Sequence, residues 1–227
     1  MNFFKKLKEN MEKDRKTLKQ LSFRQKIQFI RDYYKGQAFV LFCICLLIFY
    51  AGDAWITAQK ETVLEGFFTN DEENLFPAGQ IAKDFSAYLG LSPDQQVLFD
   101  DSLFVRPGSG GDYETSSQSK IVAYISAREL DFLVTTEELT AYYCKNFPLY
   151  DLEELLPEDL KEQLKDDFYY AQDGSKTHKA CAVSLADSRF AKGIASGDAT
   201  PHYLMAFSYT EHADTLLQFL EYAFDTD

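Results

Sequence analysis

The sequence predicts an α/β protein, with an N-terminal amphipathic helix and a single transmembrane helix followed by a mixed-sheet domain of three layers. An uncharged, mostly apolar run lies at residues 36–52, basic residues collect before it, and strand-like and helix-like segments alternate after it. Hydrophobic residues make up 46% of the chain and aromatic residues 15%, which is more than a disordered chain carries. We therefore expect a basic cytoplasmic amphipathic tail at 1–35, a transmembrane helix at 36–58 and an extracytoplasmic α/β domain at 59–227.

The charge of the chain is divided between its two ends. Residues 1–36 carry eleven Lys/Arg and four Asp/Glu, a net charge of +7, so the other residues carry −20 of the total of −13. The basic end suits an anionic lipid surface. The acidic remainder would be repelled by nucleic acid, which we do not expect as a partner.

Apolar residues in the basic tail recur at spacings of three, four or seven, which predicts an amphipathic helix over residues 3–21 with lysines on its other face. Ser22 followed by Gln25 has the form of a capping box, which predicts the start of a second helix that runs toward the membrane. Such a tail would lie on anionic lipid of the inner leaflet and determine topology. Docking to a cytoplasmic partner and a short coiled coil are the alternatives.

The uncharged run has the length of a membrane span. Its seventeen residues would cover about 25 Å as a helix, close to the hydrocarbon thickness of about 30 Å. Tyr33 and Tyr34 flank it at one end and Tyr50 and Trp55 at the other, where amphipathic rings prefer the headgroup region. Basic residues just before the run place the N-terminus in the cytoplasm. We therefore expect a single-pass signal anchor in the cell membrane, with the lipid bilayer as its partner.

There are three alternatives to a spanning helix, and each requires a particular feature of the sequence. A buried core helix would keep a polar stripe, whereas this run is apolar on every face. A cleaved signal peptide needs a short basic start and a small-residue cleavage site, and the nearest candidate, residues 52–54, is poor. A lipoprotein needs a small residue before its acylated cysteine, but Cys43 follows Phe42 and Cys45 follows Ile44.

Strand and helix signals alternate after the membrane segment. In order, they predict a strand at 63–69, a helix at 81–89 stopped by Gly90, a strand at 96–99, a loop at 107–116, a helix at 117–130, a strand at 131–134, and a helix that Thr136 caps and that runs to residue 143. Such alternation predicts a parallel or mixed sheet with helices packed on it.

Several sequence segments between residues 85 and 220 follow one another in a characteristic order of helices and strands. They are FSAYLGL at 85–91, KIVAYISARELDFLV at 120–134, ELTAYYCKNFPLYDL at 138–152, a hairpin-like segment at 173–185 and a strand and helix at 202–220. Together they resemble the first lobe of type 2 solute-binding proteins of bacterial uptake systems. In that family a helix ending in a small residue leads to an Asp that opens a strand, as Asp131 does here.

The resemblance covers most of residues 62–224 and implies a fold of about one lobe. Only about a dozen residues separate Phe190 from His202, where the family places its second lobe. Without two lobes there is no hinged cleft around a solute. The stretch QKIQFIRDYYK at 25–35 also looks like that of uncharacterised membrane-anchored proteins of Gram-positive anaerobes.

Fold analogy places a binding site at the carboxyl ends of the strands. The candidate ligand-binding residues there are Thr69, Asn70, Ser117, Thr135 and Thr136. We expect Ser117 and Thr136 to stand at helix starts, where free backbone N–H groups favour an anionic or polar ligand group.

No catalytic or cofactor motif stands out, so we do not expect an enzyme or a cofactor. The glycines at 108–111 lack the Gly-Lys-Ser/Thr of a phosphate-binding loop. His178, His202 and His212 are too widely spaced to predict a metal site. Ser, His and Asp are present without a nucleophile elbow.

Cys144 and Cys181 are the only cysteines expected outside the cell, where an oxidising compartment would allow a disulfide between them. The alternative is that each is a small core residue on an apolar face.

Three functions fit these expectations. The first is a membrane-tethered, non-catalytic interaction module that serves a membrane or envelope protein partner. The second is a sensor or receptor accessory that binds a small polar molecule with the same domain. An envelope hydrolase is the third, although no sequence context holds a nucleophile.

Overall fold

A computed structural model describes residues 22–57, 59–106, 108, 110–172, 178–191 and 200–224. The chain divides into two compact units, residues 1–59 and 60–227, and we describe each by itself. The predicted tail helix at 3–21 lies outside the described residues.

In the first unit, helix α2 (Phe23–Thr57) is a continuous helix of 35 residues without a proline. The backbone N–H of Ser22 donates to Oε1 of Gln25 at 3.0 Å, so one of the two bonds of the predicted capping box is confirmed. Over the described part of the chain, no helix combines the length and the hydropathy that crossing a membrane requires.

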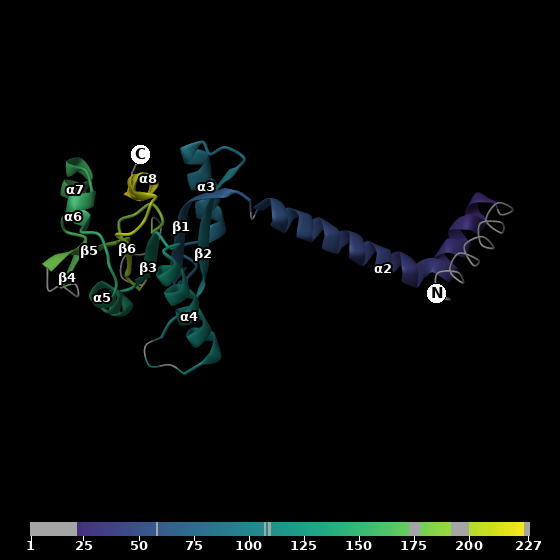
Figure 1. Ribbon diagram of the computed structural model, residues 1–227, viewed down its shortest axis with the longest axis horizontal. Coiled ribbons are helices and arrows are strands. Elements are labelled where there is room, and N and C mark those ends of the chain that lie inside the picture. The colour runs from purple at the N-terminus through teal and green to yellow at the C-terminus, as the bar shows by residue number, and fades with distance from the viewer. Residues whose placement is uncertain are drawn as a thin grey trace. The chain divides into compact units, whose positions relative to one another are not determined.

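The C-terminal domain, residues 60–227, is built on one mixed sheet of six strands (Figure 1). The order is β2-β1-β3-β6-β5-β4, in which β1 runs parallel to β2 and β3, while β6, β5 and β4 are each antiparallel to the preceding strand in that order. The strands are β1 (Glu61–Thr69), β2 (Gln95–Leu103), β3 (Phe132–Thr136), β4 (Phe168–Gln172), β5 (His178–Ser184) and β6 (His202–Ala206). The predicted mixed α/β sheet is thus confirmed.

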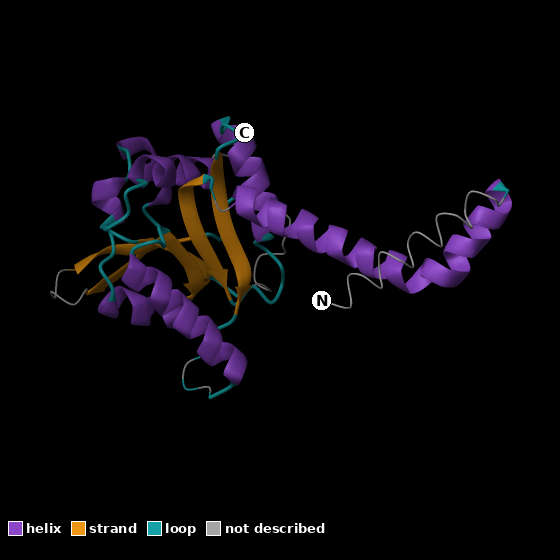
Figure 2. Ribbon diagram, turned by 45° about the vertical axis from the view of Figure 1, so that its right-hand side comes forward, coloured by secondary structure: helices purple, strands orange, loops and turns teal. Residues whose placement is uncertain are grey.

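Helices cover both faces of the sheet, so the domain has three layers (Figure 2). The helices are α3 (Ala78–Leu89), α4 (Asp112–Ala127), α5 (Glu137–Asn146), α6 (Leu152–Leu155), α7 (Glu158–Leu164) and α8 (Ala213–Phe224). Side chains alternate along each strand, so Phe132 and Val134 enter one core with α3, α6, α7 and α8, whereas Leu133 enters the other with α4 and α5.

The first core contains a group of packed aromatic rings around Phe132. This ring stacks on Phe219 of α8 with centroids 4.8 Å apart and meets Phe68 and Phe99 edge-on. It also lies directly over Gly66 of β1, where a Cβ atom would come within 2.0 Å of the ring. A glycine is therefore required at position 66 for close approach of a neighbouring side chain.

Most predicted boundaries differ from the structure by one to three residues, and two of them differ by more. Strand β2 continues to Leu103 instead of ending at residue 99, and α4 begins at Asp112 instead of residue 117. The first turn of α4 carries Asp112 and Glu114, which interact favourably with the helix dipole but show no apolar period. Residues 107–116 are rich in Gly and Ser and lack the apolar spacing of a helix, so the sequence predicts a loop there.

Candidate functional site

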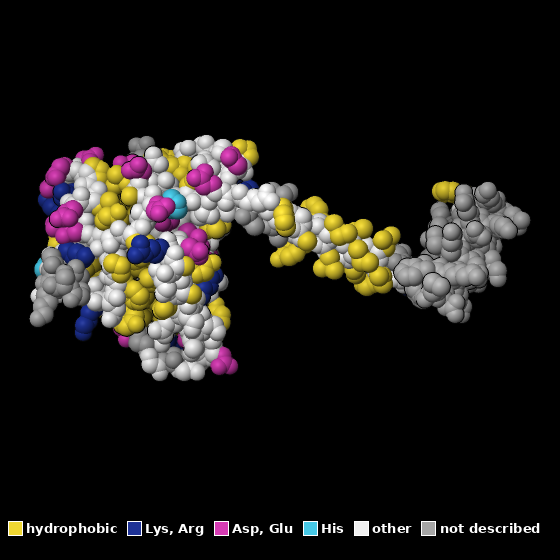
Figure 3. Space-filling view, in the orientation of Figure 1, with side chains coloured by type: hydrophobic (Ala, Val, Ile, Leu, Met, Phe, Trp, Pro, Cys, Tyr) yellow, Lys and Arg dark blue, Asp and Glu magenta, His cyan; other side chains and the backbone are white. Residues whose placement is uncertain are grey.

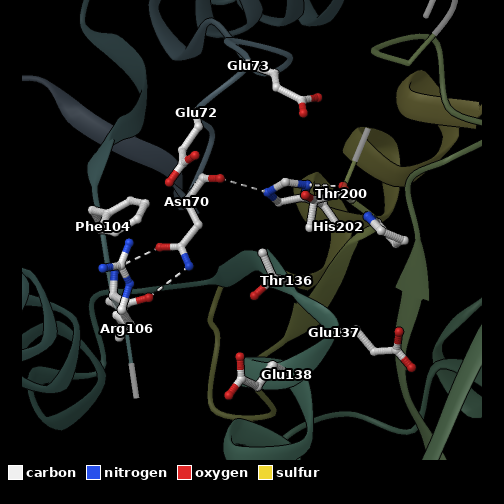
Figure 4. A pocket seen from close by; sticks show the side chains of 12 residues that line it. Asn70, Glu72, Glu73, Phe104, Arg106, Thr136, Glu137, Glu138, Thr200 and His202 are labelled. Carbon is white, nitrogen blue, oxygen red and sulfur yellow. Dashed lines mark hydrogen bonds between the residues drawn. The ribbon is translucent and has the colours of Figure 1, made fainter. Parts of the chain in front are cut away.

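A cavity of about 470 Å³ lies at the carboxyl ends of the parallel strands. The helix that follows β1 packs in one core and the helix that follows β3 packs in the other, so the two connections diverge and leave a crevice between them. The lining residues are Asn70, Glu72, Glu73, Phe104, Val105, Arg106, Thr136, Glu137, Glu138, Thr200, Pro201 and His202 (Figure 4).

Asn70 is held rigidly at the end of β1. Its side chain makes two hydrogen bonds with the backbone of Val105, accepting from the N–H at 2.7 Å and donating to the carbonyl oxygen at 2.8 Å. The backbone N–H of Asn70 donates to the carbonyl oxygen of Leu103 at 3.0 Å. The φ angle of Asn70 is 61°, which lies in the left-handed region. Asn tolerates this conformation better than most residues. These bonds join the loops after β1 and β2 at the wall of the cavity.

His202, at the start of β6, connects two backbone segments of the cavity. The side chain is only 5% exposed, with Nδ1 2.8 Å from the carbonyl oxygen of Thr200 and Nε2 3.3 Å from that of Asn70. Figure 4 shows the ring facing the Asn70 carbonyl. A neutral imidazole donates to one carbonyl and an imidazolium to both. Because both ring nitrogens face backbone oxygens, the ring is engaged in structure and is not placed as a general base.

The cavity lining is strongly acidic. Glu72 and Glu73 lie on one side and Glu137 and Glu138 on the opposite side, with Arg106 as the one Lys or Arg among the described lining residues (Figure 4). The guanidinium of Arg106 lies 5.4 Å from the centre of the Phe104 ring. Such a lining attracts a cationic group and repels polyanions.

Two of the five predicted binding residues line the cavity. They are Asn70 and Thr136, and Thr136 takes the N-cap position of α5, as predicted, without a side-chain capping bond. Thr69 and Thr135 are buried between β1 and β3, where their Oγ1 atoms lie 2.7 Å apart. Thr69 also donates to the carbonyl oxygen of Val134 at 3.1 Å. Each of these two threonines directly precedes a residue that lines the cavity, Asn70 or Thr136, but neither lines it itself.

The prediction that Ser117 opens a helix was wrong. Ser117 lies in the second turn of α4, almost fully buried, and its hydroxyl accepts from the backbone N–H of Phe104 at 3.2 Å. It fixes the segment that follows β2 and makes no free helix start.

Sequence reasoning missed the charged residues of the cavity. Glu72, Glu73, Glu137 and Glu138 occur as pairs just after predicted strands, which is a signal that position at a strand end could have supplied. His202 has no local signal, because its contact with Asn70 crosses 132 residues of sequence.

Cys144 and Cys181 are free thiols in this structure, and both are completely buried. Both pack in the core with Leu139 and Met205, and the disulfide between them stays a prediction. Among the described residues, no group of three or more His, Cys, Asp or Glu side chains could hold a metal ion.

A second polar cluster lies at the opposite ends of the parallel strands. The Asp131 carboxylate, 2% exposed, accepts from the N–H of Glu65 at 2.7 Å and lies 3.0 Å from Nδ1 of His212. Burial raises the pKa of Glu65 to about 7, and the negative charges of Glu129 and Asp131 contribute. The cluster joins β1 and β3 to the loop before α8.

No known protein family, curated protein or solved structure matches this chain. The candidate site therefore rests on its own geometry. Among the described lining residues, Thr136 and Thr200 carry the hydroxyl groups. Both ring nitrogens of His202 face backbone carbonyl oxygens. A concave lining with several polar side chains can bind a polar molecule.

Proposed function

We propose that this protein is a membrane-tethered, extracytoplasmic and non-catalytic domain that binds a small polar molecule carrying a positive charge. One observation carries the proposal, which is the cavity at the carboxyl ends of the parallel strands. It combines rigidly held polar groups at Asn70 and His202 with four glutamates. Convergent polar groups in a concave site are the usual mark of a ligand pocket.

Membrane tethering is supported by the side chains of α2. Between residues 39 and 50 its large apolar side chains are exposed, and Figure 3 shows hydrophobic side chains along the visible side of this helix. The exposed residues are Phe39, Val40, Leu41, Phe42, Ile44, Leu46, Leu47, Ile48, Phe49 and Tyr50. Lipid would cover this surface, and the basic residues before it favour a cytoplasmic N-terminus at anionic lipid.

We also propose that the domain resembles one lobe of a type 2 solute-binding protein. The parallel strands β1 to β3, with a polar cavity at their carboxyl ends, support it. A single lobe leaves the cavity open on one side, so we expect binding weaker than that of a two-lobed, hinged protein.

The second candidate is an interaction module for a membrane or envelope protein partner. Exposed tyrosines on several elements favour it, because Tyr is enriched at protein interfaces. These tyrosines are Tyr88, Tyr113, Tyr142 and Tyr170.

A thermal-shift screen of the full chain in mild detergent tests the ligand proposal. Compounds would include amines, amino acids, sugars and short peptides. A ligand that binds the folded state raises the melting temperature by mass action, so we expect a rise of several degrees with cationic compounds. No rise with any class would refute the ligand proposal and favour the interaction module.

Paired variants locate the binding. E72Q/E73Q removes two charges from one side of the cavity and should abolish most of the shift. The matched control is E153Q/E154Q, an acidic pair on α6 outside the cavity lining, which should keep it. Equal loss in both variants would show that the effect follows net charge and not the cavity.

Labelling intact cells with a membrane-impermeant lysine reagent tests the topology. We expect Lys120 and Lys161 to react while the lysines of residues 1–35 are spared. The reverse pattern would overturn the extracytoplasmic assignment.

A further inference from the structure

Two side chains, Asn70 and His202, link three segments of the cavity wall (Figure 4). The side chain of Asn70 joins the end of β1 to Val105, in the segment after β2. The backbone carbonyl oxygen of Asn70 faces Nε2 of His202 at 3.3 Å, and Nδ1 of the same ring faces the carbonyl oxygen of Thr200 at 2.8 Å. The wall segments after β1, after β2 and before β6 therefore form one connected set of polar contacts.

Both contacts of His202 become hydrogen bonds only when the imidazole is protonated. A carbonyl oxygen accepts hydrogen bonds, so each ring nitrogen needs a proton in order to bond to the oxygen that it faces. A neutral imidazole has a single N–H, which leaves the lone pair of the other nitrogen opposite an oxygen. Because the contact to Thr200 is the shorter one, we expect the neutral ring to keep its proton on Nδ1. The bond to Asn70 is then the one that a second proton adds.

Burial makes this contact matter. His202 is almost fully buried, and the ring of Phe76 meets the imidazole edge-on with centroids 5.2 Å apart. On the backbone, the sheet register places His202 opposite Thr136 of β3. A polar contact that is left unmade inside a protein costs more than one at the surface, because water does not take its place. Moving Nε2 to water would require the ring to leave this packed position.

The charges of the cavity favour a positive ring. Phe76 and Thr136, which pack against or pair with His202, are uncharged. Four carboxylates and one guanidinium line the cavity together with the ring, so the local field attracts an added positive charge. Among the described lining residues, these charged groups are Glu72 and Glu73 after β1, Arg106 after β2, and Glu137 and Glu138 on α5.

We propose that His202 is a proton-operated latch of the cavity, in which protonation of Nε2 ties the end of β1 to the start of β6 and deprotonation releases that tie. The proton comes from solvent and returns to it. Histidine changes its charge between about pH 5 and pH 8, so the latch would respond to pH near neutrality. The bridge from Asn70 to Val105 contains no titratable group and holds at either pH. The tie needs no ligand, and only its effect on binding rests on the proposed function.

The ring nitrogens report the latch directly in nuclear magnetic resonance spectra of the full chain in mild detergent, labelled with ¹⁵N-histidine. The chain has three histidines, and the variants H178Q and H212Q identify their signals. We expect both nitrogens of His202 to carry slowly exchanging protons at pH 5, and Nδ1 alone to carry one at pH 8. His178, at an exposed position on β5, is the internal reference, and its ring protons should exchange rapidly. The same protonation of His202 at both pH values, or a neutral ring protonated on Nε2, would overturn the proposal.

Hydrogen exchange measures the consequence for the cavity wall. After correction for the intrinsic effect of pH, we expect the amide of Asn70, which bonds to Leu103, to be protected about tenfold more at pH 5 than at pH 8, relative to residues 216–224 of α8. The comparison with α8 removes changes in global stability. H202Q, which has no titratable group, should lose this difference, and the control H178Q should keep it. Equal pH dependence in the wild type and H202Q would refute the latch, and the nitrogen spectrum of the wild type decides the question even if H202Q does not fold.

Discussion

The Asp131 carboxylate and the His212 imidazole meet at 3.0 Å, although 81 residues separate them in sequence. The same carboxylate accepts hydrogen bonds from the backbone of Glu65 and from the hydroxyl of Thr210. One buried side chain thus joins β1, the start of β3 and the segment that leads into α8.

Replacing Asp131 with Asn should destabilise the protein strongly. The amide keeps the shape but loses the charge and places an N–H donor among donors, so we expect a loss of about 2–4 kcal/mol in the free energy of unfolding. Urea unfolding followed by near-UV circular dichroism measures it. The control D84N, at an exposed position on α3, should change stability by less than about 0.5 kcal/mol. Equal effects of the two variants would show that Asp131 has no special structural role.

Glu65 should make the protein less stable as the pH rises. Its pKa is raised from an ordinary value of 4.5 to about 7, so the folded state binds more protons than the unfolded state between these values. The stabilisation is complete below about pH 4.5 and is lost as the pH approaches 7.

The variant E65Q removes this titration. At pH 8 it should be more stable than the wild type by about 1–2 kcal/mol, a figure reduced for solvent screening at a half-buried site. Near pH 4.5 the two should be nearly equal. Unfolding measured across this range checks the slope, and E61Q, at an exposed position on the same strand, should keep the wild-type profile. An unchanged slope in E65Q would exclude Glu65 as its source.

Gly66 should not tolerate a side chain. In G66A the new Cβ would overlap the ring of Phe132, which the surrounding aromatic rings hold in place, and we expect a loss of about 1–3 kcal/mol. The matched control is G79A on α3, where a Cβ meets nothing within 4 Å and helix propensity favours Ala. Thermal unfolding of both variants compares them, and a stable G66A would mean that the Phe132 ring can move aside.

Asn70 and Asn74 should respond differently to replacement by Gly. Both have a positive φ that Gly adopts without strain, but only the Asn70 side chain bridges to Val105. We expect N70G to lose about 1–2 kcal/mol and N74G, at an exposed position, to be neutral or slightly stabilising. Chemical unfolding measures both. Similar changes in the two variants would show that the bridge contributes nothing.

The features that the sequence predicted correctly are local ones. Gly90 does end a helix in the left-handed conformation, Thr136 does take an N-cap position, and the Ser22–Gln25 bond does form. Each depends on residues within a few positions of one another. The start of α4 was missed because an exposed, acidic first turn has no apolar spacing to detect.

By itself the sequence determined the alternation of strands and helices, the separation of basic and acidic ends and the position of Asn70 at a strand end. Periodicity and backbone preferences are properties of neighbouring residues, so they can be read along the chain. Only the tertiary structure decided that Thr69 and Ser117 are buried, that four glutamates face one cavity and that His202 reaches the end of β1. Strand order and register bring distant residues together, and that choice arises from packing across the whole sheet.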